Sequence, residues 1–363
     1  MRVGLLIYGC LDTVSGGYLY DRKLVTYLRE QGDEVEIISL PWRNYAAHLG
    51  DNFSQALLQH LVSLDVDILL QDELNHPSFF LLNQRLRPQV TYPIISIVHH
   101  LRASERHPFW IKWLYRLVER RYLNGVDGFI FNSQTTRQVV EAMTNERKPT
   151  IVAYPAGDRL DGGISEDQIR QRVFAPGPLR ILFLGNLIPR KGLHVLIEAL
   201  GQLPKDTWRL TVIGGFDHSE KYIKSLFLRI AKMGLEANIQ FYGSVADELL
   251  PEQFAKHHLL VVPSTYEGFG IVYLEGMAYG LPAVGTTEGA AYEIIQLEES
   301  GFLIDAGDSV GLAEILQNLH NDRQCLFALS CAALERFNQF PGWDQTTLQI
   351  RTYLLSILSS QAA

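Results

Sequence analysis

Two glutamates flank a glycine-rich segment in the second half of the chain. Glu267 and Glu275 are separated by seven residues, GFGIVYL. An apolar run at 259–263 predicts a strand before the glycines, and residues 271–279, followed by Gly280, predict a helix after them. The first N–H groups of such a helix have no partner within it, and they suit a phosphate group. The spacing therefore predicts an anion site with a carboxylate on either side.

The two carboxylates cannot bind the phosphate itself, because like charges repel. Each can accept hydrogen bonds from hydroxyl groups beside the phosphate, as a nucleotide sugar would present them. We expect Glu275 to bind the ribose and Glu267 the transferred sugar. The main chain between them forms the rest of the predicted donor site: Gly268, Phe269, Gly270, Ile271 and Val272. The alternative is that both glutamates lie at a helix start and on a solvated face, without a chemical role.

Two other loops also follow predicted strands. One carries the predicted donor-binding residues Gly185, Asn186, Arg190 and Lys191. Arg190 and Lys191 can neutralise a diphosphate leaving group; otherwise they are ordinary loop charges. Gly16 and Gly17 follow the first strand and open a helix, so their amides can face a phosphate, unless the pair is a simple tight turn.

Two adjacent histidines end the apolar run PIISIVHH. The end of a strand is a position where ligands bind, and a neutral imidazole can donate or accept a hydrogen bond. A histidine in an apolar run can also be a structural residue whose ring nitrogens are satisfied. From the residues alone, His99 and His100 are both candidates, and the role of His100 is left open.

The elements that must position these residues form two series in which strands and helices alternate, which predicts an α/β fold with two doubly wound, Rossmann-like domains. The predicted strands lie at 3–9, 34–40, 67–71, 93–100 and 128–133, and then at 180–185, 209–215, 239–244, 258–264 and 282–286. The Gly-, Asp- and Pro-rich stretch 155–178 is interpreted as a linker. We predict an N-terminal domain over 1–157 and a C-terminal domain over 158–342. A tail helix in 343–363 can pack on either half, including back on the first domain.

Composition excludes several classes of protein. The net charge of −8 argues against nucleic acid as a partner, and no apolar run is long enough to span a membrane. The three cysteines form neither a disulfide framework nor a zinc-type spacing, and no metal cluster is evident. We expect a cytoplasmic protein.

The segment EGFGIVYLE resembles the E-x7-E motif of the retaining glycosyltransferases of the GT-B fold, a family 4-like group. FLGNLIPRKGLHVLIEAL (183–200) is similar to that family's donor-domain opening, and the GGY at 16–18 resembles its first glycine loop. The two-domain layout and tail helix also agree. The resemblance therefore covers nearly the whole chain and is most specific in the second half.

The resemblance implies that the two domains face each other across a cleft and that a hexosyl group moves from a nucleotide sugar to an acceptor. It implies a contact from His99 to the transferred sugar and from the backbone of Val245 to the base. His99 and Glu267 would then position and stabilise the transferred sugar, and no protein nucleophile would be required. Asn186 stands where members often have arginine, so the positive charge rests on Arg190 and Lys191. We expect UDP-hexose ahead of GDP-hexose, no cofactor and no required metal.

The segment 107–123 predicts a helix with a basic face and a broad apolar face. The residues singled out on it are Trp110, Lys112, Trp113, Arg116 and Arg120. Such a helix can lie in an anionic membrane surface, which would give a lipid acceptor and a peripheral location on the inner face. The alternative is a helix that packs on the core of the first domain and exposes a basic stripe.

Other functions remain open from the sequence. The acceptor can be soluble or a polysaccharide, and a GT-B hydrolase or epimerase would use the nucleotide sugar without an acceptor. A dinucleotide oxidoreductase needs GxGxxG after the first strand, and GCLDTVSGG does not supply it. A sugar-binding module without activity is the remaining class.

Overall fold

The computed structural model describes residues 1–160, 163–216 and 220–362. The chain divides into two compact units, unit 1 (Met1–Pro155 with Pro341–Ala363) and unit 2 (Ala156–Phe340). Each contains a six-stranded sheet in which every described pair of neighbouring strands is parallel. This is the α/β architecture that the alternation of apolar runs and helical patterns predicts.

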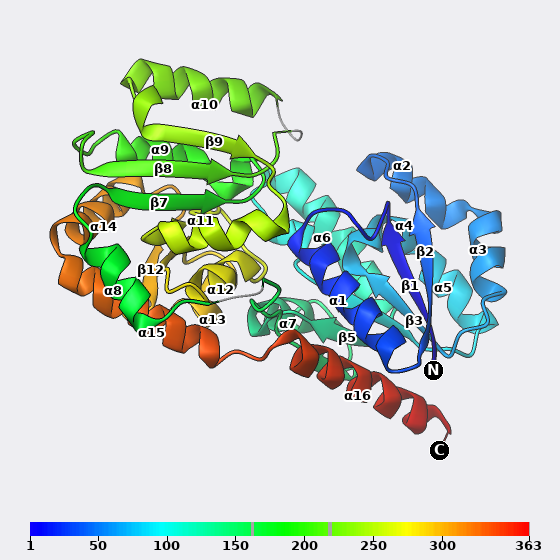
Figure 1. Ribbon diagram of the computed structural model, residues 1–363. Coiled ribbons are helices and arrows are strands. Elements are labelled where there is room, and N and C mark those ends of the chain that lie inside the picture. Colours follow the sequence, from blue (N-terminus) through cyan, green and yellow to red (C-terminus); the bar gives the residue numbers. More distant parts are fainter. Residues whose placement is uncertain (161–162, 217–219, 363) are drawn as a thin grey trace. The chain divides into compact units, whose positions relative to one another are not determined.

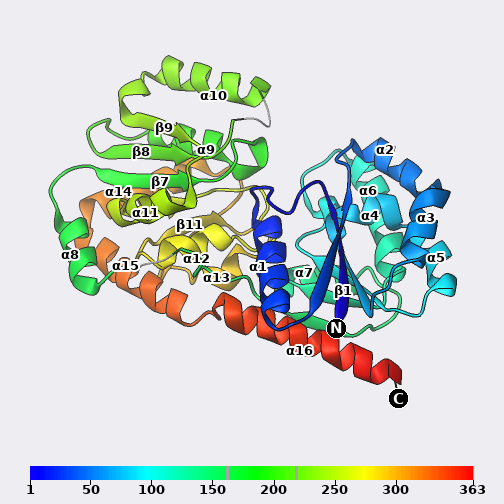
Figure 2. The same ribbon diagram turned by 45° about the vertical axis from the view of Figure 1, so that its right-hand side comes forward.

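The sheet of unit 1 has the order β2-β1-β3-β4-β5-β6. Its strands are β1 (Arg2–Tyr8), β2 (Glu34–Leu40), β3 (Ile68–Asp72), β4 (Ile94–Val98), β5 (Gly128–Phe131) and β6 (Thr150–Val152). Every residue of β3, β4 and β5 is buried, because helices cover both faces of a doubly wound sheet. Figure 2 shows β1 nearly edge-on, with helix α1 on one side and α4 and α6 on the other.

The helices of unit 1 surround this sheet. They are α1 (Gly16–Glu30), α2 (Tyr45–Leu49), α3 (Gln55–Val62), α4 (His76–Phe79), α5 (Leu82–Leu86), α6 (Phe109–Asn124), α7 (Gln134–Glu141) and α16 (Trp343–Ala362), with short 3-10 turns η1 (Gly50–Phe53), η2 (Glu73–Asn75), η3 (Arg87–Gln89) and η4 (Arg102–Ser104). The tail helix α16 packs against α1. Arg351 Nε donates to Asp33 Oδ2 over 2.7 Å, and Thr346 Oγ1 donates to the carbonyl of Tyr154, also over 2.7 Å.

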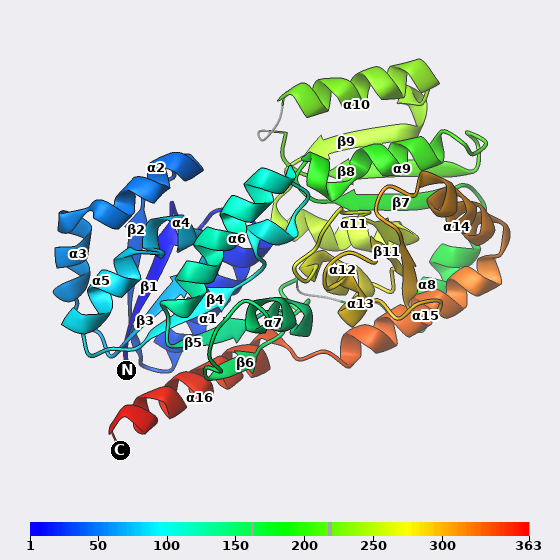
Figure 3. The ribbon, with the colours of Figure 1, turned by 180° about the vertical axis from the view of Figure 1, so that it is seen from behind.

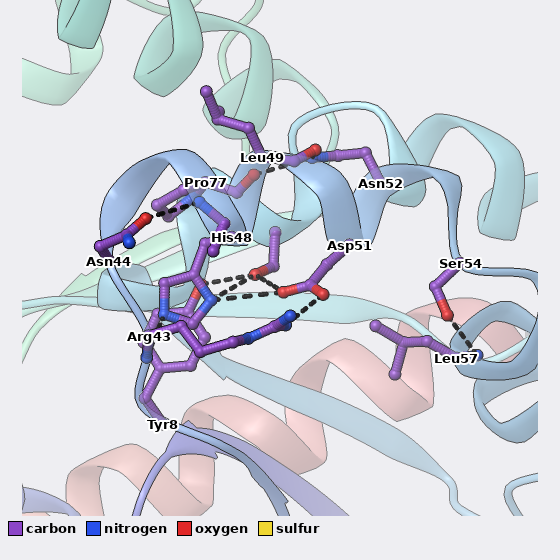
Figure 4. A network of polar contacts seen from close by, with 12 residues as sticks. Tyr8, Arg43, Asn44, His48, Leu49, Asp51, Asn52, Ser54, Leu57 and Pro77 are labelled. Atoms are coloured by element: carbon purple, nitrogen blue, oxygen red, sulfur yellow. Dashed lines mark hydrogen bonds and ion pairs between the residues drawn. The ribbon is translucent and has the colours of Figure 1, made fainter.

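A polar network fixes the segment after β2 to the carboxyl end of β1 (Figure 4). The ring of Tyr8 stacks on His48 with centroids 3.9 Å apart, and its hydroxyl is 2.6 Å from Ser78 Oγ. Ser78 donates in turn to Asp51 Oδ2 over 2.7 Å, and Arg43 forms an ion pair with the same carboxylate. The hydroxyl of Tyr8 and the carboxylate of Asp51 therefore both have partners in this network.

The sheet of unit 2 has the order β12-β11-β10-β7-β8-β9. Its strands are β7 (Leu179–Leu184), β8 (Trp208–Ile213), β9 (Ile239–Gly243), β10 (Leu259–Val261), β11 (Ala283–Thr286) and β12 (Gly301–Ile304). Its helices are α8 (Glu166–Phe174), α9 (Leu193–Leu200), α10 (Glu220–Met233), α11 (Leu250–Lys256), α12 (Ile271–Met277), α13 (Ala291–Ile294), α14 (Ser309–Asn321) and α15 (Arg323–Asn338), with 3-10 turns η5 (Pro189–Lys191), η6 (Glu236–Asn238) and η7 (Asp247–Leu249). Helices α11 and α12 cover one face (Figure 1), and α9 and α14 cover the other (Figure 3).

Both sheets contain a point where the strand order reverses. In unit 1 the chain moves from β1 to one neighbour, β2, and then to the other, β3. In unit 2 the same reversal occurs at β7, between β8 and β10. Ligands of open α/β sheets bind outside the carboxyl ends of the strands at such a switch point. We therefore expect ligand-binding residues in the loops after β1, β3, β7 and β10.

The structure contains every strand predicted from the apolar runs and adds β6 and β12, which are short and lie at the sheet edges. It corrects the prediction of a linker over 155–178, of which residues 161 and 162 lie outside the described part. This stretch contains α8, which begins with a capping box formed by Ser165 and Gln168. The Gly, Asp and Pro content obscured that signal.

Helix α8 also supports α12. The side chain of Arg172 is buried, and it donates to the carbonyl of Tyr279 over 2.9 Å and to that of Gly280 over 2.7 Å. These carbonyls follow the end of α12, where a cation is favourable and carbonyls lack helical partners. Burial lowers the pKa of Arg172 to about 10, which still leaves it charged at neutral pH.

We expect Arg172→Met to lower the free energy of unfolding by about 2 kcal/mol, because two buried carbonyls lose a charged donor. Urea unfolding followed by circular dichroism measures the change. Arg170→Met is the matched control on the same helix: Arg170 is exposed, so its loss should cost less than about 1 kcal/mol. Equal effects of the two variants would contradict a capping role for Arg172.

Candidate functional site

Glu267 lies in the loop that joins β10 to α12, and its backbone is held on both sides. Its N–H donates to the carbonyl of Glu288, and its own carbonyl accepts from Ala290 N over 2.8 Å. Gly289 lies between those partners with φ +89°, and a Cβ there would come within 2.1 Å of the carbonyl oxygen of Glu267. Only glycine permits this approach, so the backbone position of Glu267 is fixed by the loop after β11.

The carboxylate of Glu267 is buried and surrounded by donors. Its Oε1 accepts from Lys191 Nζ over 2.5 Å and from Ser264 Oγ over 2.6 Å, and Arg190 Nη1 lies 3.9 Å from Oε2. Burial alone would raise the pKa of Glu267, but the charges of Lys191 and Arg190, together with the hydrogen bonds, lower it to about 2. The group is therefore ionised at any physiological pH.

Lys191 and Arg190 reach Glu267 because the loops after β7 and β10 are joined. Arg190 donates from Nη1 to the carbonyl of Tyr266 over 3.0 Å, and its own carbonyl accepts from Thr265 N over 2.7 Å. Gly192 has φ +73°, and a Cβ there would lie 2.0 Å from the carbonyl oxygen of Pro263. The two loops at the switch point thus bring two cations to one carboxylate, which leaves a net positive charge of about one unit.

The other carboxylate of the motif, Glu275, is buried in α12 and has a different partner. Arg159 forms an ion pair with Glu275 and a second one with Asp247, where Nη1 is 2.5 Å from Oδ2. Sequence reasoning missed Arg159, which lies in the stretch interpreted as a linker. Nothing local identifies it, because its partners are far along the chain.

The remaining predicted residues of unit 2 lie around these two carboxylates. Gly185 directly follows β7, and Asn186 comes next. A Cβ on Gly185 would lie 3.6 Å from Lys191 Cδ. Phe269 is buried, Gly270 is the N-cap of α12 with φ +101°, and Ile271 and Val272 begin that helix. Val245 is half-buried in the loop after β9, and Gly268 follows Glu267 in the loop after β10. Because α12 has only seven residues, its dipole is small, and the anion site depends chiefly on the two cations.

In unit 1 the structure brings His99 and Gly17 together. A Cβ on Gly17 would lie 3.1 Å from Cδ2 of the His99 ring, so the missing side chain admits the imidazole. Gly16 is the first residue of α1, and Ser15 caps the helix by accepting from Tyr18 N over 3.3 Å. The carbonyl of His99 accepts from Asn132 Nδ2 over 2.8 Å, which ties the loop after β4 to the loop after β5.

The two adjacent histidines have different surroundings. His100 Nε2 lies 3.1 Å from Glu105 Oε1. His99 Nε2 faces the buried carboxylate of Asp21, 3.7 Å from Oδ1, and the ring makes an edge contact with Tyr20 at a centroid distance of 5.3 Å. His99 is therefore the member of the pair that an acidic side chain of α1 contacts.

The sequence did not predict the buried acidic groups near His99. Asp72 ends β3 and Glu73 follows it, and both are buried together with Glu119 of α6. Burial is the largest effect on each, and it raises the pKa values of Asp72, Glu73 and Glu119 to about 7. Sequence spacing could not reveal this group because its members come from separate elements. We assign no metal to it, and a metal-free site stays a prediction.

Helix α6 presents two different faces along its length. Val118, Tyr122 and Leu123 are buried, whereas Phe109, Trp110 and Trp113 are exposed, with 86%, 69% and 60% of their surface accessible. The basic residues Lys112, Arg116 and Arg120 are exposed as well. Core packing therefore accounts for the second half of the helix but not for its first half. Among the residues that the structure describes, no helix combines the length and the apolarity that crossing a bilayer requires.

This chain resembles known proteins both in sequence and in fold. Residues 165–335 match the family described as glycosyl transferases group 1. The GDP-mannose-dependent alpha-(1-6)-phosphatidylinositol monomannoside mannosyltransferase of Mycobacterium tuberculosis is 27% identical over 259 residues, which cover 66% of this chain and 64% of that protein. The phosphatidyl-myo-inositol mannosyltransferase of Mycobacterium leprae is 26% identical, covering 99% of this chain and 98% of that one. Sucrose-phosphate synthase from Thermosynechococcus elongatus superposes with a TM-score of 0.82 at 19% identity, covering 99% of both chains. The predicted GT-B fold is confirmed.

The lowered pKa of Glu267 predicts an acid-dependent loss of stability. A carboxylate whose folded pKa lies below its unfolded value stabilises the fold above the unfolded pKa, near 4.5, and loses this effect as pH falls toward 2. We expect Glu267→Gln to cost about 3 kcal/mol above pH 5, an effect that shrinks progressively toward pH 2. Urea unfolding at a series of pH values measures it.

Glu252→Gln provides the control, because Glu252 is exposed on α11 and forms an ion pair with Lys256 at the surface. Its cost should stay below about 1 kcal/mol across the same range. A pH-independent cost of Glu267→Gln would show that the loss arises from packing and not from the ionised carboxylate.

Proposed function

We propose that the protein is a retaining hexosyltransferase that uses a nucleoside diphosphate sugar, on the premise that residues 165–335 match the family of group 1 glycosyl transferases. The observation that carries the proposal is the ionised carboxylate of Glu267, buried against Lys191 and beside Arg190 at the switch point of unit 2. A sugar diphosphate needs cations for its phosphates and an acceptor for its hydroxyl groups, and this group supplies both.

The proposed chemistry follows from the charges. When the bond between the sugar and the diphosphate breaks, negative charge develops on the leaving phosphate, and preorganised cations in a dry site stabilise it. Lys191 and Arg190 are held in place before the donor binds. Part of their charge already balances Glu267, and a diphosphate bound beside this group would face both cations.

Glu267 would orient the sugar and not remove a proton. A carboxylate with a pKa of about 2 is a weak base, so it is poorly suited to deprotonating an acceptor hydroxyl. It can still accept hydrogen bonds from sugar hydroxyl groups. The acceptor's proton would pass to the departing phosphate, which fits transfer with retention of configuration and no protein nucleophile.

Glu275 would bind the ribose, in keeping with the sequence prediction. Arg159 occupies part of its carboxylate, but two carboxylate oxygens offer about four acceptor positions, so ribose hydroxyl groups can bind beside the guanidinium. The backbone after β9, at Val245, would meet the base. A main-chain contact does not distinguish uracil from guanine, so GDP-mannose and UDP-glucose are the two donors to compare first.

We propose a lipid acceptor at a membrane surface. Two mannosyltransferases similar to this chain carry phosphatidylinositol lipids in their names. The exposed aromatic and basic residues at the start of α6 fit such a surface, because Trp enters the interface and Lys and Arg attract anionic lipids. A soluble or polysaccharide acceptor remains the alternative, as does hydrolysis of the donor without an acceptor.

The test of function separates the two carboxylates. We expect Glu275→Ala to raise the Kd of the nucleoside diphosphate about tenfold, because it removes ribose contacts worth roughly 1.4 kcal/mol. Glu267→Ala should leave that Kd within about threefold and lower kcat at least about a hundredfold. Calorimetry with GDP and UDP, followed by transfer assays with NMR of the product anomer, measures both.

Glu248→Ala is the control, because Glu248 is exposed in η7 near the predicted base site and should change neither quantity. If both glutamate variants altered only thermal stability, the two residues would have no chemical role. An inverted anomer would contradict retention, and donor breakdown unaffected by any lipid or soluble acceptor would favour a hydrolase.

Membrane binding is tested on α6. Wild-type protein should co-sediment with vesicles that contain an anionic phospholipid and not with phosphatidylcholine alone. Trp110→Ala combined with Lys112→Glu should weaken this binding at least about fivefold, since one basic residue near the surface contributes about 1 kcal/mol. Leu228→Ala with Lys232→Glu makes the same changes in charge and apolarity on α10 of unit 2 and should have no effect. Equal binding by all three proteins would exclude α6 as the contact.

A further inference from the structure

The switch point of unit 1 carries a buried acidic cluster next to His99. Asp21 lies in the second turn of α1, Asp72 ends β3, and His99 follows β4, which is the neighbour of β3 in the sheet. Asp21 is fully buried and Asp72 is 1% exposed. The three side chains therefore meet at the switch point of unit 1, where ligands of such sheets bind.

One face of α1 determines how the His99 ring is held. Gly17, Tyr20 and Asp21 follow the spacing i, i+3 and i+4, so they lie on the same side of the helix. Gly17 admits the ring, Tyr20 contacts its edge, and Asp21 faces its Nε2 at 3.7 Å. The imidazole is thus fixed in position from a single helix face.

The cluster is not satisfied by hydrogen bonds. Within the described residues, Asp21 Oδ1 and Oδ2, Asp72 Oδ2 and His99 Nε2 are enclosed and have no hydrogen-bond partner. A buried carboxylate without a partner is costly, and an opposite charge offsets much of that cost. The imidazole of His99 provides this charge only when it is protonated.

We propose that Asp21 is a positioning residue that keeps His99 in its imidazolium form, with Nε2 directed to Asp21 and Nδ1 left as the donor for a ligand. An imidazolium has two N–H donors and no acceptor. His99 would then give a charge-assisted hydrogen bond to a sugar oxygen, and it could not act as a base. Only the identity of this ligand as the transferred sugar rests on the proposed function.

All acidic groups that face His99 act in the same direction. Burial lowers the pKa of His99, but Asp21 from α1, Asp72 from β3 and Glu73 from η2 outweigh burial and raise it. Asp72 itself has a pKa raised to about 7 by burial and by Asp21, so it carries a proton for part of the time near neutral pH. His99 should remain protonated above pH 6.5, in contrast to an ordinary imidazole.

The decisive measurement is the titration of His99 in the whole protein by NMR of histidine Cε1, assigned by the signal lost in His99→Gln. In wild-type protein the pKa of His99 should lie above 6.5. In Asp21→Asn, which keeps the side-chain volume and removes the charge, it should fall by at least about one unit. The resonance of His60, exposed on α3, should not move and serves as the internal control.

A kinetic measurement links this titration to transfer. Asp21→Asn should lower kcat at least about tenfold and leave the Kd of the nucleoside diphosphate unchanged, because a charge-assisted hydrogen bond becomes a neutral one. The loss should be smallest at acidic pH, where His99 is protonated without help. A role limited to folding would not produce this pH dependence.

Three results would overturn the proposal. They are a wild-type His99 pKa at or below 6.5, an unchanged pKa in Asp21→Asn, or a stoichiometric metal ion in the purified protein that abolishes the titration on binding. The wild-type titration remains decisive even if the variant fails to fold. Because the titration needs no activity, a raised pKa in a protein without transfer would refute the proposed function and leave the role of Asp21 intact.

Discussion

The ion pair between Glu267 and Lys191 is the interaction on which unit 2 depends. It joins the loop after β7, where the strand order reverses, to the loop after the neighbouring strand β10. Breaking a buried ion pair leaves an uncompensated charge, so each partner requires the other. Gly192 and Gly289 are part of the same constraint, because each lets a second backbone approach to a distance that a Cβ would forbid. The chemistry and the local fold of unit 2 therefore share one set of contacts.

The two switch points carry opposite charge. In unit 2, two cations meet one carboxylate, and the group attracts an anion. In unit 1, Asp21, Asp72 and Glu73 lie near a single imidazole, and a phosphate placed there would meet carboxylates. The glycine at 17 is explained by the close approach of the His99 ring, and this reason is independent of phosphate. We therefore regard the cations of unit 2 as the main support for a diphosphate.

The sequence predicted those features that depend on residues close together along the chain. Apolar runs located the central strands because burial on both faces requires such runs, and the motif from Glu267 to Glu275 located a carboxylate site because its spacing lies within one loop and one helix. Edge strands β6 and β12 were missed because they are only partly buried, so burial constrains their sequences less than those of the central strands. Arg159, Asp21 and Asp72 were missed for another reason. Their partners come from distant elements, and a single charged residue within an apolar pattern does not reveal what it faces in the fold.

The protonation states limit how the proposed transfer can proceed. A base must accept a proton near neutral pH, and Glu267, with a pKa of about 2, is far from that condition. If Asp21 holds His99 as an imidazolium, as we propose, that ring has no free acceptor. Neither candidate catalytic residue can then take the proton of the acceptor hydroxyl. In the transfer that we propose, the leaving phosphate would then be the remaining base, and it would depart from the same face of the sugar that the acceptor approaches. On this proposal, retention of configuration is the stereochemical result that we expect.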